Sequence, residues 1–419
     1  MHSFLSLLLS FHVLLFSAFV SPAALTPSNL LFTETAPSAG EDTQTPAADT
    51  NQTDKTADTL ALSVSAPCAV LMEASTGTII FEKDSHTVRH PASITKIMTL
   101  ILIFDALEKG SIQLTDSVTV SEHAASMGGS QVFLEAGETQ DVETMIKCIS
   151  IASANDACVA MAEFICGSEE AFVAEMNAKA KSLGMNDTTF VNCCGLDVDG
   201  HMTSAYDVAL MSRELTVRYP EIHNYCTIWM DTMTHVTAKG SKEFGLTNTN
   251  KLIRQYEYAT GLKTGSTGLA KFCVSATAEK DGMELIAVIM GADDPKQRFN
   301  DAKTLLNFGF SKCRIYTDEH PETLAPLPVK KGTSDTLKLE FKNSFQYLST
   351  DGSDFSAVKK EISLPENATA PVKKGEKIGE ATYQLGAEKI GSVDIIAAED
   401  IAKAGFSDYI KEILFRYFS

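Results

Sequence analysis

The alternation of apolar and polar residues predicts an antiparallel sheet built from two distant parts of the chain. Residues 68–84, CAVLMEASTGTIIFEKD, form two strand-like runs around the turn-forming sequence Ser-Thr-Gly. Residues 271–292, KFCVSATAEKDGMELIAVIMGA, form two more, joined by an Asp-Gly pair that favours a tight hairpin. The preceding segment, 259–268, is placed to run as a further antiparallel strand beside them.

Helical spacing predicts helices that flank this sheet. A helix is expected from Ser93 to about Gly110, another over residues 169–184, and a third over 294–310. Residues 141–167 are also helical in period, but the sequence SAND interrupts their centre, which predicts a loop that presents its polar side chains outward. Helices around an antiparallel sheet indicate an α/β or α+β layered domain, expected over residues 61–314.

Beyond residue 314 the pattern changes, and short alternating runs with Lys-Gly turns predict a small all-β domain over residues 315–397. Residues 398–419 return to helical spacing, with charged residues off one apolar face. This pattern is typical of an amphipathic helix lying in a membrane surface; a terminal helix packed on its own domain is the alternative. The apolar face comprises Phe406, Ile410, Ile413, Leu414 and Tyr417.

The N-terminus predicts export. Residues 1–24 form an apolar run that ends in small residues, as a signal peptide does, although an uncleaved N-terminal anchor is the alternative. Residues 25–60 are rich in Thr, Ser, Ala, Pro and Asp without hydrophobic periodicity, which is typical of a disordered linker. We therefore expect a protein at the outer face of the cytoplasmic membrane, in the cell-wall space.

Composition and charge exclude some classes of binding partner and metal site. The chain has 419 residues, 44% of them hydrophobic, which suffices for a sizeable core. The formal charge of −19 argues against a nucleic-acid partner, because phosphates need basic side chains. The nine cysteines are odd in number and irregular in spacing, so they predict neither a disulfide framework nor a zinc site. Several lie among apolar residues and are interpreted as buried packing residues.

The candidate chemistry starts at Ser93 and Lys96, which are three residues apart and would share a helix face. A serine hydroxyl is a poor nucleophile without a base beside it, and a lysine held neutral by burial can be that base. Alone the S-x-x-K pattern is weak, since it recurs at Ser356–Lys359 in the expected β domain. A serine that caps a helix, with a solvated lysine, is the ordinary explanation.

Two further short motifs change this assessment. Ser153 and Asn155 lie in the interrupted helix, and Lys263-Thr264-Gly265 lies on the strand expected beside the hairpin, where a glycine lets a ligand approach the backbone. A helix kink and an exposed edge strand would explain each motif separately. The three motifs in this order make coincidence improbable.

S-x-x-K, S-x-N and K-T-G in this order resemble the motif set of penicillin-binding proteins and serine β-lactamases. From about residue 62 onward, the chain is similar to the low-molecular-mass penicillin-binding proteins that act as D-Ala-D-Ala carboxypeptidases. The resemblance is carried by VLMEASTGTIIFEKDSHTVRHPASITKIMT and LIAVIMGADDPKQR, together with the small β domain and the amphipathic tail. It implies a penicillin-binding/β-lactamase-like fold and removal of the terminal D-Ala from peptidoglycan stem peptides, with β-lactams as covalent inhibitors and no cofactor.

The resemblance also implies roles for individual residues. Ser93 would be the acylated nucleophile, Lys96 its base, and Ser153 a proton relay to the leaving group. Asn155 would bind the peptide and orient Lys96. The remaining implied residues are Lys263 and Thr264, which would recognise substrate; Gly265; Ser266, which with Ser93 would supply the oxyanion-hole amides; and Arg298, which would serve the terminal carboxylate.

The loop at residues 197–201 contains three potential metal ligands. Asp197, Asp199 and His201 could suggest a metal site, but their spacing fits no standard ligand set. We therefore expect a hydrogen-bonded loop and no metal.

Other functions remain open on the sequence. A class A β-lactamase would need a deacylating glutamate, and no E-x-x-L-N motif is present. An endopeptidase on cross-linked peptidoglycan or a transpeptidase would use the same motifs. A catalytically inactive wall-binding module is disfavoured because all three motifs are complete.

Overall fold

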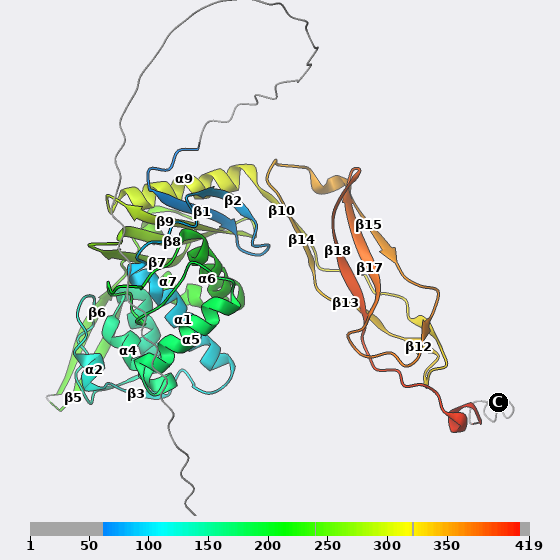
Figure 1. Cartoon of the computed structure of the whole chain (residues 1–419), viewed down its shortest axis with the longest axis horizontal. Helices are drawn as coiled ribbons and strands as arrows, with labels where there is room; N and C mark the ends of the chain where they lie inside the picture. The colour runs from blue at the N-terminus through cyan, green and yellow to red at the C-terminus, as the bar shows by residue number, and fades with distance from the viewer. Residues whose placement is uncertain (1–61, 239, 321, 411–419) are drawn as a thin grey trace, which may run out of the picture. The chain divides into compact units, whose positions relative to one another are not determined.

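The computed structural model describes residues 62–238, 240–320 and 322–410 (Figure 1). The expected signal peptide (1–24) and linker (25–60) lie outside these residues, as does the last part of the expected amphipathic helix. The remaining expectations concern the described chain.

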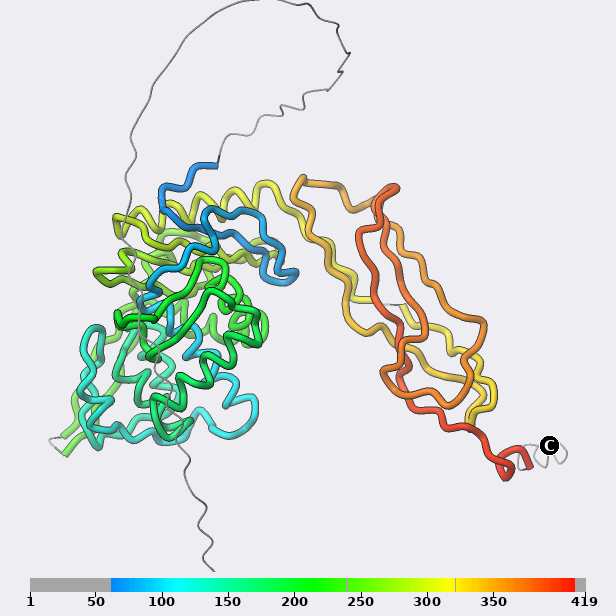
Figure 2. The backbone as a smooth tube through the Cα atoms, in the orientation of Figure 1, coloured from blue at the N-terminus to red at the C-terminus, as the bar shows by residue number. Residues whose placement is uncertain are grey.

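A five-stranded antiparallel sheet forms the centre of the first domain. Its order is β2-β1-β9-β8-β7, so the N-terminal hairpin joins the later strands through the pair β1 and β9. Figure 2 shows the blue N-terminal segment lying beside the later, yellow-green strands. The strands are β1 (Cys68–Glu73), β2 (Ile79–Lys83), β7 (Ala259–Thr267), β8 (Lys271–Lys280) and β9 (Met283–Ala292). This arrangement confirms the sheet expected from alternation, with β7 at one edge.

Successive side chains of the buried strands serve two different cores, because they point to opposite faces of the sheet. Val70 and Val288 pack with α1 (Lys96–Glu108), α4 (Asn155–Cys166) and α6 (Ala205–Arg218). Their chain neighbours Leu71 and Ile289 pack instead with α9 (Gln297–Lys312). The sheet therefore lies between two helical layers, which confirms the expected layered fold (Figure 1).

The remaining elements complete this domain. They are a 3₁₀ turn (Ala92–Thr95), β3 (Ser117–Thr119), α2 (Glu122–Ala125), β4 (Thr139–Asp141), α3 (Val142–Lys147), a π-helical turn (Cys148–Ala152), α5 (Glu169–Ser182), a second 3₁₀ turn (Pro220–Ile222), α7 (His223–Cys226), β5 (Met230–Thr237), β6 (Gly240–Thr247) and α8 (Leu252–Gln255).

The expected β domain is present and consists of small sheets. Strand β10 pairs with β14; β12, β11 and β16 form a second sheet; and β13, β18, β17 and β15 form a third. The strands are β10 (Arg314–Asp318), β11 (Leu327–Lys330), β12 (Thr336–Leu337), β13 (Leu339–Phe341), β14 (Phe345–Ser349), β15 (Val358–Ser363), β16 (Ala368–Thr369), β17 (Lys377–Leu385) and β18 (Glu388–Ala397), with a 3₁₀ turn at Phe355–Ala357. Tyr383 stacks on Phe345 at its centre, 3.8 Å between ring centroids.

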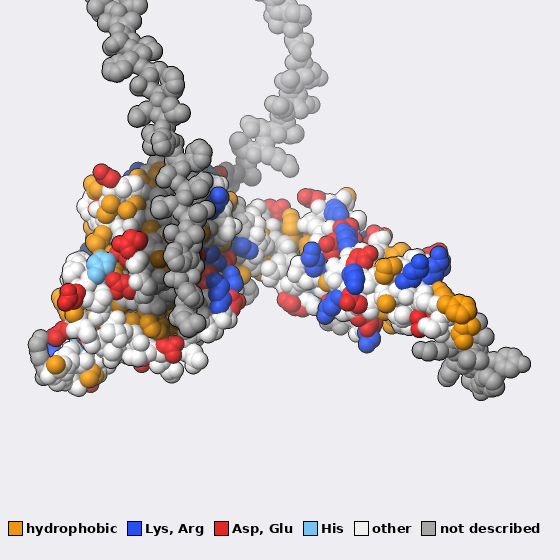
Figure 3. All heavy atoms as spheres, turned by 60° about the horizontal axis from the view of Figure 1, so that its bottom comes forward, with side chains coloured by type: hydrophobic (Ala, Val, Ile, Leu, Met, Phe, Trp, Pro, Cys, Tyr) orange, Lys and Arg blue, Asp and Glu red, His pale blue; other side chains and the backbone are white. Residues whose placement is uncertain are grey.

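The terminal helix predicted over residues 398–419 begins only at Phe406, and its later residues lie outside the described chain. The prediction was wrong for the preceding residues, because Ile401 and Lys403 form β-bridges with Val372 and Gly332 of the β domain. Phe406 is 84% exposed, and Tyr409 and Ile410 are also exposed. On the face in Figure 3, acidic and basic side chains mix over the β domain, whereas hydrophobic side chains gather at the end that leads into this segment. Among the described residues, no helix combines the length and apolar character that crossing a membrane requires.

All nine cysteines are free thiols, and all but Cys166 are buried. Their burial agrees with their interpretation as packing residues.

Candidate active site

The candidate nucleophile lies on a tight turn before helix α1. Ser93 belongs to the 3₁₀ turn Ala92–Thr95, and the α-helix starts only at Lys96, so the predicted helix start at Ser93 was wrong by one turn. Ala92, directly before Ser93, is buried and has a φ of +48°, a conformation that is strained for a residue with a side chain. Contacts made by the folded chain must therefore hold this turn.

Lys96 is completely buried and its Nζ atom has three oxygen neighbours. It lies 3.1 Å from Ser93 Oγ, 2.6 Å from Asn155 Oδ1 and 2.6 Å from the backbone oxygen of Cys194. The last two oxygens can only accept hydrogen bonds, whereas the serine hydroxyl can also donate one. Nζ donates to all three oxygens, and this places Ser93 Oγ within hydrogen-bonding distance of the lysine amine.

The S-x-N segment departs from the predicted outward-facing loop. Left-handed Ser153 (φ +61°) and extended Ala154 separate the π-helical turn from α4, and Asn155 is the first residue of α4. The side chains of Ser153 and Asn155 are buried rather than presented outward, because each finds a lysine partner. The Asn155 amide is oriented by donation from Nδ2 to Gly128 O over 2.7 Å.

Lys263 on β7 is the second buried lysine of the site. Its Nζ donates to Ser153 Oγ over 2.9 Å and to the backbone oxygen of Thr264 over 3.1 Å. Burial, followed by repulsion from Lys96, lowers the pKa of Lys263 to about 7. The neighbouring Thr264 hydroxyl is hydrogen-bonded to Thr249 at 2.8 Å.

The glycine of K-T-G lets β7 contact the nucleophile turn directly. A Cβ atom on Gly265 would lie 2.9 Å from Pro91 O and 3.0 Å from the amide nitrogen of Ile94. Ser266, the next residue, is exposed. The three motifs of the sequence thus converge around Lys263 and Gly265 in the middle of strand β7.

Arg298, in the first turn of α9, lies against β7 and β8. Its Nη1 donates to the backbone oxygens of Gly265 and Cys273, each over 3.1 Å. The side chain also lines a cavity of about 360 Å³ with Lys251 and Lys296. Its hydrogen bonds therefore link it to the K-T-G strand through the backbone.

Sequence reasoning missed the loop at residues 192–196. The Asn192 side-chain oxygen accepts hydrogen bonds from the amides of Cys194, Gly195 and Leu196, at 2.7–3.2 Å. This arrangement orders the loop whose Cys194 carbonyl contacts Lys96. An Asn three residues before a Gly is a turn signal that could have indicated the loop. Nothing in the sequence indicates that this loop contacts Lys96.

Two of the three loop residues that suggested a metal, Asp197 and His201, have partners within the chain. His201 bonds through both ring nitrogens, and Asp197 accepts a hydrogen bond from Thr267. Within the described residues, a group close enough to share a metal ion occurs in the β domain, at Asp318, His320 and Glu322. The Lys360 ammonium already lies among them, 2.9 Å from Asp318 Oδ2.

Comparison with known proteins agrees with this geometry. A family profile described as D-alanyl-D-alanine carboxypeptidase (Peptidase S11) matches residues 51–294, and one described as Penicillin-binding protein 5, C-terminal domain, matches residues 316–403. The chain is 44% identical over 354 residues to D-alanyl-D-alanine carboxypeptidase DacF of Bacillus subtilis, covering 83% of this chain and 89% of the relative. It is 32% identical over 358 residues to DacC of Escherichia coli, covering 82% and 86%.

A solved structure is similar as well. Penicillin binding protein 5 from Haemophilus influenzae matches with a TM-score of 0.69 and 29% identity, over 81% of this chain and 98% of that one. Family profile, relatives and fold agree, and they confirm the resemblance carried by the three motifs. The chain belongs to the D-alanyl-D-alanine carboxypeptidase family of serine-type peptidases.

Proposed function

We propose that this chain removes the terminal D-Ala from peptidoglycan stem peptides through an acyl-enzyme on Ser93. The observation that carries the proposal is the environment of Lys96, whose Nζ has Ser93 Oγ at 3.1 Å and two carbonyl oxygens as its other partners. A neutral Lys96 can accept the hydroxyl proton while Ser93 Oγ attacks the carbonyl carbon of the penultimate D-Ala. The backbone amides of Ser93 and Ser266 would stabilise the resulting oxyanion.

Expulsion of the terminal D-Ala requires a proton on its nitrogen. Ser153 would pass its hydroxyl proton to the leaving nitrogen as the C–N bond breaks, and Lys263, 2.9 Å away, would replace that proton. A lysine with a pKa of about 7 can exchange a proton near neutral pH. A water molecule in the place of the departed amine would then hydrolyse the ester by the reverse sequence of proton transfers.

Substrate recognition would use the same strand. Gly265 keeps β7 in contact with the turn that carries Ser93, Thr264 would bind the terminal carboxylate, and Asn155 would bind the peptide amide. Arg298 would contribute positive charge to carboxylate binding, and its bonds to the carbonyls of Gly265 and Cys273 also hold the strand in place.

The activity can be tested with a short substrate. Mass spectrometry of a digest of diacetyl-Lys-D-Ala-D-Ala should show loss of a single D-Ala with the wild-type chain and none with Ser93→Ala. An intact peptide after incubation with folded wild type would contradict the proposal.

A second assay separates the alternatives. Labelled penicillin should form a long-lived covalent adduct at Ser93, because β-lactams acylate the same hydroxyl. Rapid turnover of penicillin would favour a β-lactamase, and absence of a label would favour an inactive wall-binding module. Cleavage of cross-linked dimeric stem peptides faster than monomeric ones would favour an endopeptidase.

We further propose that the protein is exported and held at the outer face of the cytoplasmic membrane. The exposed apolar residues at 406–410 support a surface-bound terminal helix. Members of this family act on peptidoglycan, which lies outside the cytoplasm.

A further inference from the structure

The carbonyl of strained Ala92 is held by a buried hydrogen-bond chain that the proposed reaction does not itself use. Thr95 Oγ1 donates to Ala92 O over 2.8 Å, and the same oxygen lies 2.8 Å from His201 Nε2. Thr95 is fully buried and His201 is 1% exposed. These hydrogen bonds thus connect the loop at residues 191–201 to the turn that carries Ser93.

The partners of His201 define its protonation state. Thr95 has a single hydroxyl proton, which goes to Ala92 O, so Nε2 must donate to Thr95. The other ring nitrogen, Nδ1, accepts from the Val191 amide over 2.9 Å. A ring that donates at Nε2 and accepts at Nδ1 is the neutral Nε2–H tautomer.

The electrostatic surroundings agree with a neutral ring. Burial is the main cause that lowers the pKa of His201, to about 4, and the charges of His90 and Lys96 lower it further. Asp197 acts in the opposite direction. The ring therefore stays neutral at the pH at which the enzyme would work.

The held carbonyl has no room to move toward the loop. A Cβ atom on Gly195 would lie 1.9 Å from Ala92 O and 2.9 Å from the amide nitrogen of Ser93. Strained backbone of this kind costs about 1–3 kcal/mol and persists only where surrounding contacts fix it. Thr95 and His201 supply such contacts on the side of the carbonyl.

We propose that His201 is a positioning residue for Ser93, acting through the Thr95 hydroxyl and the Ala92 carbonyl. This inference rests on the proposed acylation of Ser93. Thr95 occupies the second variable position of the S-x-x-K motif. The motif itself would therefore contain the residue that is hydrogen-bonded to His201 of the 191–201 loop. Loss of these hydrogen bonds should let the turn relax and should move Ser93 Oγ relative to Lys96 Nζ.

The test is the second-order rate of Ser93 acylation by labelled penicillin, measured with thermal unfolding of each variant. Thr95→Val and His201→Phe remove the hydrogen bonds with similar volume and should lower the rate about 10- to 100-fold, as expected for a misplaced nucleophile. Thr95→Ser keeps the hydroxyl and should stay within about twofold of wild type. The double variant should be no slower than the slower single variant, because both break the same chain.

A matched control separates positioning from loss of stability. Ser212→Ala removes another buried hydroxyl, which donates to Val208 O within α6 and is hydrogen-bonded to Ser275 of β8, and should lower the unfolding temperature without changing the acylation rate. If His201→Phe does not fold, Thr95→Val against Thr95→Ser carries the test. Ring nitrogen shifts by NMR should also show the Nε2–H tautomer of His201 between pH 5 and 8.

The outcomes are distinguishable. Folded Thr95→Val and His201→Phe proteins whose acylation rates lie within about twofold of wild type would overturn this inference and leave the proposed function intact. An Nδ1–H tautomer of His201 would have the same consequence. A folded wild-type chain that takes no penicillin label would refute the proposed function, and the inference with it.

Discussion

Lys263 places a titrating amine inside the folded domain, and its pKa has a consequence for stability. Burial and the charge of Lys96 lower the pKa from 10.5 to about 7. Between these two values the unfolded chain binds a proton that the folded chain has released. Stability should therefore rise with pH across this window, and the penalty for the buried charge is complete below pH 7.

Lys263→Met should accordingly be more stable than wild type at pH 6, by on the order of a few kcal/mol. The difference should shrink as the pH rises toward 10, because wild type then folds with a neutral amine. Urea unfolding at a series of pH values measures this, with the exposed Lys181→Met as control. A stability difference that stays constant with pH would contradict the lowered pKa of Lys263.

Gly195 shows why a single residue beside the nucleophile turn matters. It has a φ of +90°, and an added Cβ would collide with Ala92 O. Gly195→Ala should therefore lower penicillin acylation by about 100-fold. Gly200→Ala is a matched control, since Gly200 has a φ of +83° but its added Cβ would meet nothing nearer than 4.0 Å. Equal losses in both variants would mean that backbone strain, and not displacement of the turn, is responsible.

At the scale of elements, local periodicity predicted the five strands of the central sheet and helices α1, α4, α5 and α9, because a strand or helix shows its pattern within its own residues. It did not predict α6 or the β5–β6 hairpin. The start of α1 was not predictable in this way. The Ala92–Thr95 turn depends on Gly195 and on the Thr95–His201 contact, which come from about one hundred residues away. The S-x-N interruption was visible, but the direction of Ser153 and Asn155 depends on lysines from two other elements.

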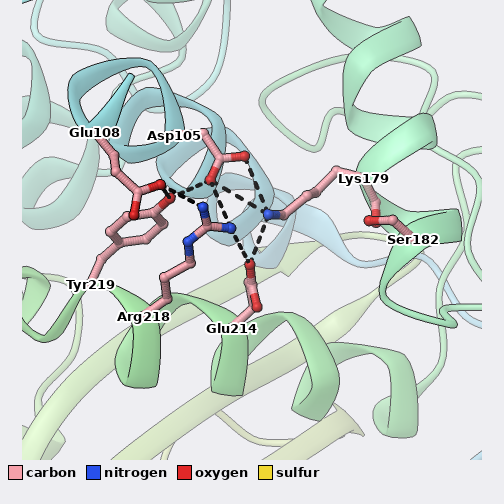
Figure 4. A network of polar contacts seen from close by, with 7 residues as sticks. All are labelled: Asp105, Glu108, Lys179, Ser182, Glu214, Arg218 and Tyr219. Carbon is pink, nitrogen blue, oxygen red and sulfur yellow. Dashed lines mark hydrogen bonds and ion pairs between the residues drawn. The ribbon is translucent and has the colours of Figure 1, made fainter. Parts of the chain in front are cut away.

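A polar network joins the far end of the catalytic helix to its neighbours (Figure 4). Lys179 of α5 bridges Asp105 of α1 and Glu214 of α6, at 3.2 and 2.7 Å. Tyr219 donates a hydrogen bond to the same Asp105, and Arg218 reaches Glu108. The network therefore ties α1, α5 and α6 together where α1 ends.

Removing the bridging ammonium should destabilise the domain. Lys179→Met leaves Asp105 and Glu214, both mostly buried, with Arg218 as their remaining cation and should cost about 1–3 kcal/mol in urea unfolding. Lys181→Met on the same helix, where the side chain is exposed, should change stability by less than about 0.5 kcal/mol. Equal effects of the two substitutions would show that the network contributes no stability.

At the scale of the whole chain, the three short motifs in their order predicted the acyl-serine site that penicillin-binding proteins and serine β-lactamases share. The longer matching segments and the C-terminal β domain were needed to predict the carboxypeptidase family. The contribution of the Cys194 carbonyl was not predictable, since a backbone oxygen has no residue signature and Asn192 positions it only in the folded loop. The partition into a peptidase domain and a β domain was visible from the change in pattern near residue 315. The terminal segment exposes the apolar side chains of Phe406, Tyr409 and Ile410.

That segment should bind lipid if its apolar face is a membrane contact. The wild-type chain should float with vesicles containing anionic phospholipid, and the double variant Phe406→Asp, Ile410→Asp should stay in the soluble fraction, because each charge opposes burial among acyl chains. Met230→Asp provides the control, since Met230 is 66% exposed but lies on the peptidase domain. Equal flotation of wild type and the double variant would mean that lipid does not contact this face, and the helix would then be expected to pack against protein.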